Sequence, residues 1–234
     1  MPNHPVVSQQ QWVEARKALL AKEKELTHLR DELARQRRAL PWVKVSKPYT
    51  FEGPQGTRSL AELFGSHSQL IVYHFMFGTD WDEGCPSCSF WADNFESIPI
   101  HLAHRDASLV AISRAPYEKL AAYRRRMGWT FPWYSSFGSD FNFDFQVSYT
   151  KAQVDSGRAE HNYAPMKVLE ELPGISVFYR DDANDLYHTY STYQRGLDML
   201  NGAYHYMDLL PKGRNEDDLP WTMAWLRRHD QYDD

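Results

Sequence analysis

The chain has 234 residues, of which 42% are hydrophobic and 15% aromatic, and a formal net charge of −5 at pH 7. This length suits one generous domain with an extension, and the negative charge argues against nucleic acid or an anionic membrane as partners. No segment approaches the roughly 18 apolar residues of a membrane-spanning helix. Because residues 1–8 also lack the layout of a signal peptide, we expect a cytoplasmic protein.

Residues 8–39 predict one long helix, since Ser8 can cap it and neither Pro nor Gly occurs between Pro5 and Pro41. Five apolar residues fall seven positions apart along it, namely Trp12, Leu19, Leu26, Leu33 and Leu40. A heptad stripe of this kind packs either on its own domain or on a second subunit. A helix this long overhangs a compact domain, so the extension at 1–40 is a predicted homodimer contact.

The next stretch alternates strands and helices. Strands are predicted at 42–45, 49–51, 69–77, 108–113 and 129–134, and helices at 60–64, 88–104 and 116–127. The strand 69–77 is continuously apolar, as expected for a central strand covered on both faces. Pro99 falls inside the helix 88–104 and should kink it or end it early.

The second half is less regular. Residues 136–171 are polar and mixed, which indicates an insertion; a hairpin, 174–180 with 186–190, and a helix at 196–210 follow. The tail is acidic apart from 221–226, a predicted docking segment. The order of elements predicts an α/β fold with a thioredoxin-like mixed sheet flanked by helices, a domain at 41–212 and a tail at 213–234.

The only two cysteines, Cys85 and Cys88, form a C-x-x-C motif between a predicted strand and a predicted helix. In a reducing compartment such a pair is catalytic or metal-binding more often than structural. Strand, loop, C-x-x-C and helix is the context in which the motif indicates thiol–disulfide chemistry.

Several separate motifs resemble one bacterial family. They are LPW at 40–42, YHFMF at 73–77, GCPSC at 84–88, AISRAP at 111–116, RMGW at 126–129, FPW at 131–133, YSTY at 190–193 and RGLD at 195–198. Together they are similar to the thioredoxin-like family catalogued as domain of unknown function 899, whose members are described as predicted dithiol–disulfide oxidoreductases or isomerases. The resemblance covers nearly the whole chain and implies the fold and thiol–disulfide chemistry, but no particular substrate.

In a site of this kind the first cysteine lies at a helix N-terminus, where unpaired N–H groups stabilise its thiolate. Cys85 would attack a substrate disulfide or a peroxide, and Cys88, one turn into the helix, would resolve the mixed disulfide. Pro86 would stiffen the turn between them. The acidic residues Asp82 and Glu83 would oppose thiolate formation if they lie close.

Four residues are predicted to bind the substrate, namely Trp81, Pro86, Trp91 and Pro173. Pro173 matches by order the cis-proline that faces the cysteines in thioredoxins, and an ordinary trans proline in a turn is the alternative. Core packing is the alternative for the two tryptophans. His74 is either a buried core histidine or, at the carboxyl end of its strand, a proton-transfer group facing the cysteines.

The predicted function is a thiol–disulfide oxidoreductase that acts on protein or low-molecular-weight disulfides and thiols, without cofactor or metal. One alternative is a binding or assembly protein without turnover. Another is a zinc site in which His101 and His104 join the cysteines, a spacing near that of a zinc finger. The third is a thiol peroxidase, although the chain lacks the Pro-x-x-x-Thr-x-x-Cys pattern of peroxiredoxins.

Overall fold

The computed structural model describes residues 4–232, and the chain divides into two compact units, Met1–Pro41 and Trp42–Asp234. The first unit contains the helix α1 (Gln9–Arg38). A capping box begins it: Ser8 Oγ accepts the Gln11 N–H at 3.3 Å, and Gln11 Oε1 accepts the Ser8 N–H at 3.0 Å. The predicted long helix is therefore confirmed, with Ser8 as its cap.

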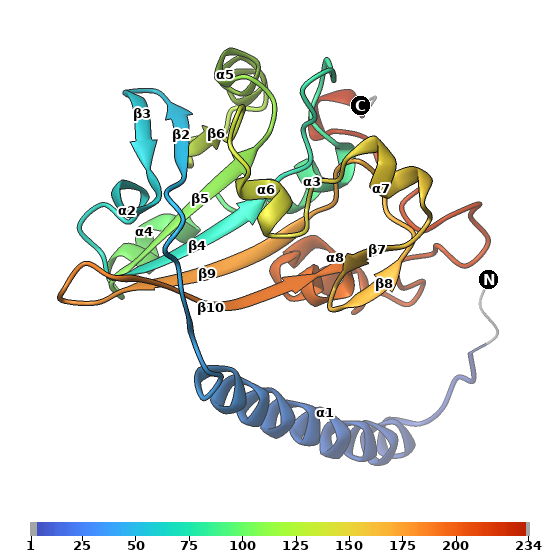
Figure 1. Cartoon of the computed structure of the whole chain (residues 1–234). Helices are drawn as coiled ribbons and strands as arrows, with labels where there is room; N and C mark the ends of the chain where they lie inside the picture. The colour runs from blue at the N-terminus through green and yellow to red at the C-terminus, as the bar shows by residue number, and fades with distance from the viewer. Residues whose placement is uncertain (1–3, 233–234) are drawn as a thin grey trace. The chain divides into compact units, whose positions relative to one another are not determined.

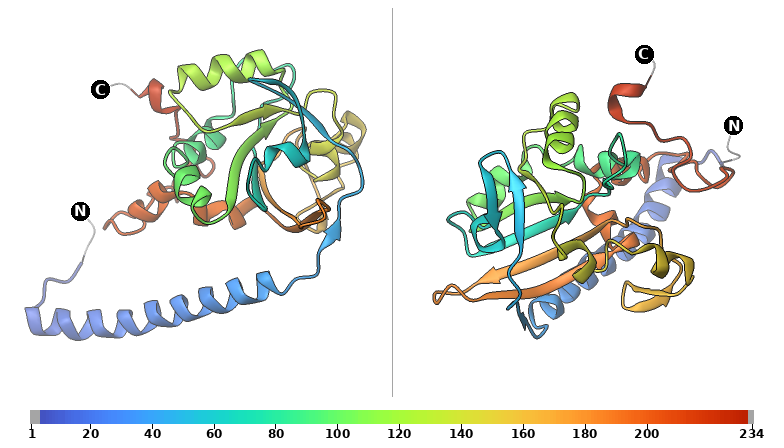
Figure 2. Two further views of the ribbon diagram at one scale, coloured as in Figure 1. Left: turned by 90° about the vertical axis from the view of Figure 1, so that its left-hand side faces the viewer. Right: turned by 45° about the horizontal axis from the view of Figure 1, so that its top comes forward.

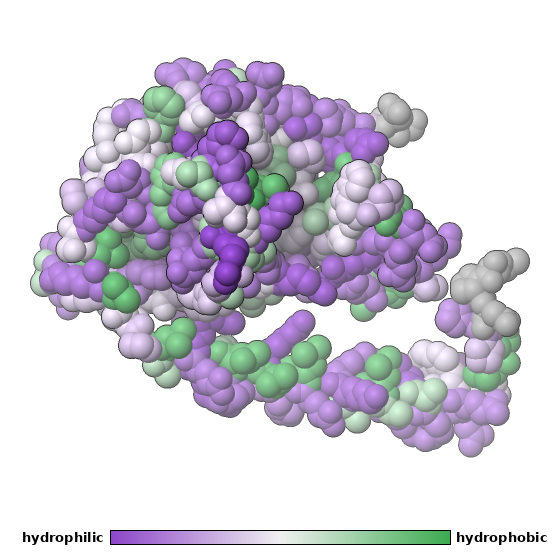
Figure 3. All heavy atoms as spheres, turned by 45° about the vertical axis from the view of Figure 1, so that its right-hand side comes forward, coloured by the Kyte–Doolittle hydropathy of each residue, from purple (hydrophilic) through white to green (hydrophobic). Residues whose placement is uncertain are grey.

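The heptad stripe of α1 remains half-exposed. Its residues Trp12, Leu19, Leu26, Leu33 and Leu40 are between 44% and 54% exposed, and Figure 3 shows apolar patches alternating with hydrophilic ones along the helix. An apolar stripe in water favours a partner. That this stripe joins two copies of the chain stays a prediction.

The second unit is built on one large mixed sheet with helices on both faces (Figure 1). Its strands are β1 (Val43–Lys44), β2 (Thr50–Gly53), β3 (Gly56–Ser59), β4 (Gln69–His74), β5 (Ala107–Ser113), β6 (Trp133–Ser135), β9 (Gly174–Arg180) and β10 (Leu186–Tyr193). A separate hairpin pairs β7 (Ala159–His161) with β8 (Ala164–Met166). The helices are α2 (Leu60–Leu63), α3 (Pro86–Ala92), α4 (Ile98–Ala103), α5 (Tyr117–Arg126), α6 (Phe141–Asp144), α7 (Lys151–Asp155) and α8 (Gly202–Met207), with 3-10 turns at Gln194–Leu200 and His229–Gln231.

The order of strands in the sheet is β1-β10-β9-β4-β5-β6-β2-β3. At its centre β4 and β5 are parallel, β9 runs antiparallel to β4, and β10 runs antiparallel to β9. A parallel pair joined through helices, followed by an antiparallel hairpin on the same side of β4, is the thioredoxin arrangement. The predicted fold class is confirmed.

The two faces of the sheet carry separate cores, because successive side chains of a strand point to opposite sides. On one face Tyr73, from β4, packs with residues of α3 and α5. On the other face Leu70 and Val72, also from β4, pack with residues of α2 and α6. Two further views show α5 lying across one side of the sheet (Figure 2).

Two predicted elements end differently. The strand predicted at 69–77 ends at His74, although Phe75 and Phe77 are buried all the same. The helix predicted at 88–104 is interrupted, as Pro99 led us to expect, but the break lies before Pro99: α3 ends at Ala92 and α4 begins at Ile98. At the break the Asn94 side chain donates to the carbonyls of Phe90 and Trp91, at 2.8 and 3.3 Å, which replaces helical hydrogen bonds. Pro99 lies in the first turn of α4, where a missing N–H costs nothing.

The second half is more broken than predicted. The insertion at 136–171 holds α6, α7 and the β7–β8 hairpin, and the β9–β10 hairpin is confirmed. The helix predicted at 196–210 is wrong, since a 3-10 turn and α8 meet at Asn201, whose side chain caps α8 by accepting the Tyr204 N–H at 3.2 Å. The segment 213–232 lies in the second unit and contacts it through Trp225 and Leu226. Within residues 4–232, no helix is long and apolar enough to cross a membrane.

Candidate active site

The two cysteines lie where the loop after β4 enters α3. Cys85 is the N-cap residue of α3 and Pro86 occupies its first turn, which leaves Cys85 beside the free N–H groups of the helix. The Cys85 N–H donates to the Met76 carbonyl at 3.0 Å, and the Met76 N–H donates to Cys88 Sγ at 3.3 Å. Each cysteine is therefore fixed to the chain just beyond β4.

Both cysteines are free, but their surroundings differ. Hydrogen bonding from the Cys88 thiol, and from the N–H groups of Cys88 and Ser87 and the Ser87 hydroxyl, lowers the pKa of Cys85 to about 7 against the opposing effect of burial. Burial raises the pKa of Cys88 well above its ordinary value, and its side chain contacts the buried Tyr73 hydroxyl. One thiol is thus prepared to ionise near neutral pH while its neighbour stays protonated.

A cavity of about 700 Å³ lies beside the cysteine pair, and Ser87 and Cys88 form part of its lining. Two of the predicted substrate-binding residues, Trp91 and Pro173, also line it. The Trp91 ring is buried and its Nε1–H donates to the Leu197 carbonyl at 2.8 Å, so this wall is rigid. No peptide bond among residues 4–232 is cis, so Pro173 follows the trans alternative.

The other two predicted binding residues are not on the wall of this cavity. Pro86 is exposed at the start of α3. Trp81 is half-buried and its ring covers Gly78, where an added Cβ would lie 2.8 Å from Trp81 Nε1. Lys119 Nζ donates to the Trp81 carbonyl at 2.8 Å and so holds this part of the loop against α5. Trp91 and Pro173 thus share the cavity with Cys88, whereas Pro86 lies between the cysteines outside it and Trp81 packs on the core cluster that contains Cys88.

His74 lies on the opposite face of the sheet from the cysteines. Its ring packs on Phe141, with ring centroids 5.6 Å apart, and Nε2 is 2.8 Å from Ser176 Oγ. The Ser176 hydroxyl is in turn 2.8 Å from Ser191 Oγ, which is 2.7 Å from Nε2 of His188. Burial lowers the pKa of His74 to about 3. His74 is therefore a neutral core histidine that does not face Cys85 or Cys88.

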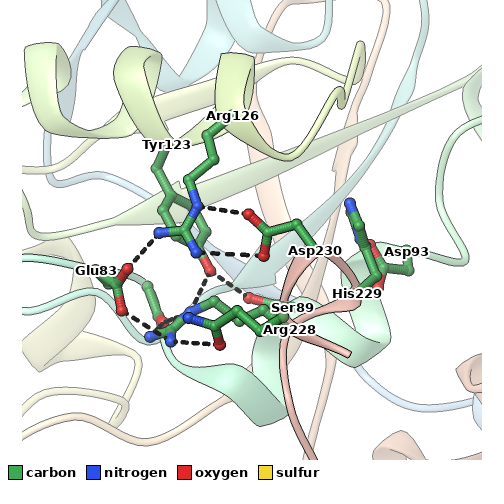
Figure 4. Close-up of polar contacts among 10 residues, drawn as sticks. Glu83, Ser89, Asp93, Tyr123, Arg126, Arg228, His229 and Asp230 are labelled. Atoms are coloured by element: carbon green, nitrogen blue, oxygen red, sulfur yellow. Dashed lines mark hydrogen bonds and ion pairs between the residues drawn. The ribbon is translucent and has the colours of Figure 1, made fainter. Parts of the chain in front are cut away.

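The residues that sequence reasoning missed surround the cysteine loop. Tyr73 contacts Cys88 from β4, and the continuously apolar strand has no alternation that would mark this side chain as facing the cysteines. The C-terminal segment supplies Arg228, which reaches the carbonyl of Gly84 at 2.7 Å (Figure 4). These two residues are 144 positions apart, and no local pattern connects them.

The zinc alternative is not assembled in the structure. Within residues 4–232, no group of three or more His, Cys, Asp or Glu side chains is placed to hold a metal ion. His101 and His104 are exposed at the end of α4.

Several solved structures are similar to the chain at low identity. Peroxidoxin BcpB from Mycobacterium tuberculosis is 16% identical, with a TM-score of 0.45, over 69% of this chain and 96% of that one. The bacterioferritin comigratory protein of Xanthomonas campestris, which has alkyl peroxide reduction activity, is 13% identical, with a TM-score of 0.43, over 68% of this chain and 94% of that one. A yeast mitochondrial 1-Cys peroxiredoxin is 13% identical, with a TM-score of 0.41, over 69% and 73%. Similarity this low transfers no chemistry to the chain.

Among curated proteins, none matches the chain significantly. The model of the family described as "Bacterial protein of unknown function (DUF899)" matches residues 1–232. This match spans the long helix, the thioredoxin-like sheet and the C-x-x-C loop together. The chain belongs to this family.

Proposed function

We propose that the protein is a thiol–disulfide oxidoreductase that cycles Cys85 and Cys88 between dithiol and disulfide. The observation that carries this proposal is the unequal pair at the start of α3. Cys85 has a pKa lowered to about 7 by donated hydrogen bonds, and Cys88 is a buried thiol directed at it. A nucleophile with a pKa near ambient pH and a protonated resolving partner are what disulfide exchange requires.

The reaction then has two balanced steps. In the first, the Cys85 thiolate attacks one sulfur of a substrate disulfide; the substrate S–S bond breaks, a mixed disulfide forms on Cys85, and one substrate thiolate leaves. In the second, that thiolate takes the proton of Cys88, and Cys88 Sγ attacks Cys85 Sγ; the bond from Cys85 to the substrate breaks, and the second substrate sulfur leaves as a thiolate that takes a proton from solvent. The substrate gains two electrons and the pair becomes a disulfide, which an external dithiol must reduce before the next cycle.

The cavity beside Cys88 supports a substrate that is small or that presents an extended segment. Its volume, about 700 Å³, suits a ligand of modest size. Trp91 offers an apolar wall, and Asp198 and Arg214 add polar groups at the same cavity. In this proposal, the substrate sulfur that leaves during the first step lies in this cavity. There it is next to the Cys88 thiol, which attacks in the second step.

Turnover tests the proposal directly. With dithiothreitol as electron donor, the protein should accelerate the reduction of insulin or of hydroxyethyl disulfide well above the rate of dithiothreitol alone. The rate of insulin precipitation, or the consumption of the small disulfide, is the measurement. A rate equal to that of the donor alone with both substrates would contradict the proposal and favour a binding or assembly protein without turnover.

The alkylation of Cys85 by iodoacetamide should depend on pH. Because the thiolate is the reactive form, the rate rises with pH and should reach half its maximum near pH 7, where an ordinary cysteine would still be mostly protonated. Peptide mapping after brief alkylation at several pH values gives the rate for each cysteine. A Cys85 midpoint at or above 8.5, the ordinary value for cysteine, would contradict this prediction.

A further inference from the structure

One side chain of the C-terminal segment, Arg228, contacts the loop before Cys85 (Figure 4). Its Nη2–H donates to the Gly84 carbonyl at 2.7 Å, and its Nη1 lies 2.8 Å from Glu83 Oε2. Its Nε–H donates to the Tyr123 hydroxyl at 2.8 Å. The Arg228 side chain is only 12% exposed, and its partners Gly84 and Tyr123 are buried, whereas the Glu83 side chain is 39% exposed.

A second route leads from Arg228 to the other side of Cys85. The Ser89 hydroxyl donates to the Cys85 carbonyl at 2.9 Å, and Ser89 Oγ is 2.9 Å from the Tyr123 hydroxyl. A carbonyl only accepts and a guanidinium only donates, so the direction of the chain is fixed: Arg228 donates to Tyr123, Tyr123 to Ser89, and Ser89 to Cys85. Arg228 thus binds the carbonyl before Cys85 directly and the carbonyl of Cys85 through two hydroxyls.

The Arg228 guanidinium also pairs with an acidic residue that precedes the C-x-x-C motif. Glu83 is paired with both Arg228 and Arg126, and Arg126 also donates to Asp230 through Nε at 2.6 Å. Two carboxylates therefore face two guanidiniums, and the charge of Glu83 is neutralised beside the cysteines. The neighbouring Asp82 is exposed. On the inner side of the loop, a Cβ on Gly84 would lie 2.7 Å from the Phe75 ring, so the loop is held from behind as well.

We infer that Arg228 is a positioning residue of the redox site: it fixes the peptide groups on both sides of Cys85 and cancels the charge of Glu83, so that the Cys85 thiolate forms and attacks near neutral pH. This inference rests on the proposed function, because a reactive Cys85 thiolate serves disulfide exchange. Its test does not need turnover, because the ionisation of Cys85 can be measured without a substrate.

The test compares Arg228→Gln with Arg228→Lys and with a matched control, Arg227→Gln. Arg227 is the adjacent arginine, exposed, with its guanidinium on the carbonyl of Leu226. In the full-length chain, the midpoint of Cys85 alkylation should move to higher pH in Arg228→Gln, and the rate at pH 7 should fall about tenfold. Arg228→Lys keeps the positive charge but lacks the planar guanidinium with its several N–H donors, so it should restore part of the Cys85 alkylation rate. In Arg227→Gln, the midpoint of Cys85 alkylation should equal that of the unsubstituted protein.

Two further variants separate charge from position. Glu83→Gln combined with Arg228→Gln removes the uncompensated carboxylate, so its midpoint should return part of the way to the original value. Tyr123→Phe interrupts the hydroxyl chain and leaves the ion pair, so it should show a smaller shift in the same direction. Because Tyr123→Phe retains Arg228, it keeps the inference testable if Arg228→Gln fails to fold.

The inference is overturned if folded Arg228→Gln and Tyr123→Phe both alkylate with the original midpoint and rate. It is also overturned if Arg227→Gln shifts the midpoint as much as Arg228→Gln. If these shifts occur as expected while the protein reduces no disulfide, the proposed function fails and the role of Arg228 in Cys85 ionisation stands.

Discussion

Replacing Cys85 by serine should abolish disulfide reduction, with turnover falling at least about a thousandfold to the rate of the electron donor alone. The reason is that serine at this position is not ionised near neutral pH, so no nucleophile attacks the substrate. Cys88 cannot substitute, because it is buried and its pKa is raised. The measurement is the rate of insulin reduction by Cys85→Ser and by the unsubstituted protein.

Replacing Cys88 by serine should have a different result, which makes the pair of variants informative. The chain has only two cysteines, so each variant retains a single thiol. With a chromogenic aromatic disulfide, Cys88→Ser should release one coloured thiol and retain the other as a stable mixed disulfide on Cys85. The unsubstituted protein should release both and form its own disulfide. Equal behaviour of the two variants would contradict the assignment of attacking and resolving roles.

The second large effect concerns acid stability and originates at His74. Its pKa is about 3 in the folded chain because of burial, against about 6.5 in an unfolded chain. Between these values the unfolded state binds a proton that the folded state does not, so the free energy of unfolding falls as the pH falls from about 6.5 toward 3. At pH 4.5 the loss relative to neutral pH is about 3 kcal/mol.

His74→Gln retains an amide that can bond Ser176 but cannot be protonated. It should therefore show less loss of stability between pH 7 and pH 4.5 than the unsubstituted protein, although its stability at pH 7 is lower because packing changes. Urea unfolding at the two pH values is the measurement. His101→Gln, at an exposed position on α4, is the control and should keep the original pH dependence. An unchanged pH dependence in His74→Gln would show that this histidine does not limit acid stability.

Local signals predicted the parts of the fold that local chemistry determines. The Ser8 cap and the C-x-x-C at a helix start are both present as predicted. Pro99 indicated that the helix would be interrupted, but not that the break would lie before it, between Ala92 and Ile98. That break depends on the Asn94 side chain, which finds backbone carbonyls only once α3 has formed.

The site was only partly predictable for a similar reason. Cys85 and Cys88 are marked by their spacing, and Trp91 lies on the helix that follows them, so all three could be named. His74 could not be assigned to a face, because an apolar strand covered on both sides gives no alternation to read. Arg228 lies far along the chain from Gly84, and its role depends on how the C-terminal segment returns to the loop.

The most direct measurement of the central claim is the redox equilibrium of the cysteine pair itself. Equilibration of the purified protein in thiol–disulfide buffers of graded potential, followed by acid quenching and intact mass, reports the fraction oxidised. We predict a reversible change from dithiol to intramolecular disulfide, seen as the loss of two hydrogen masses, with a single midpoint that Cys85→Ser and Cys88→Ser both lack. A pair that remains reduced in every buffer, or that oxidises only between chains, would contradict a thiol–disulfide function of Cys85 and Cys88.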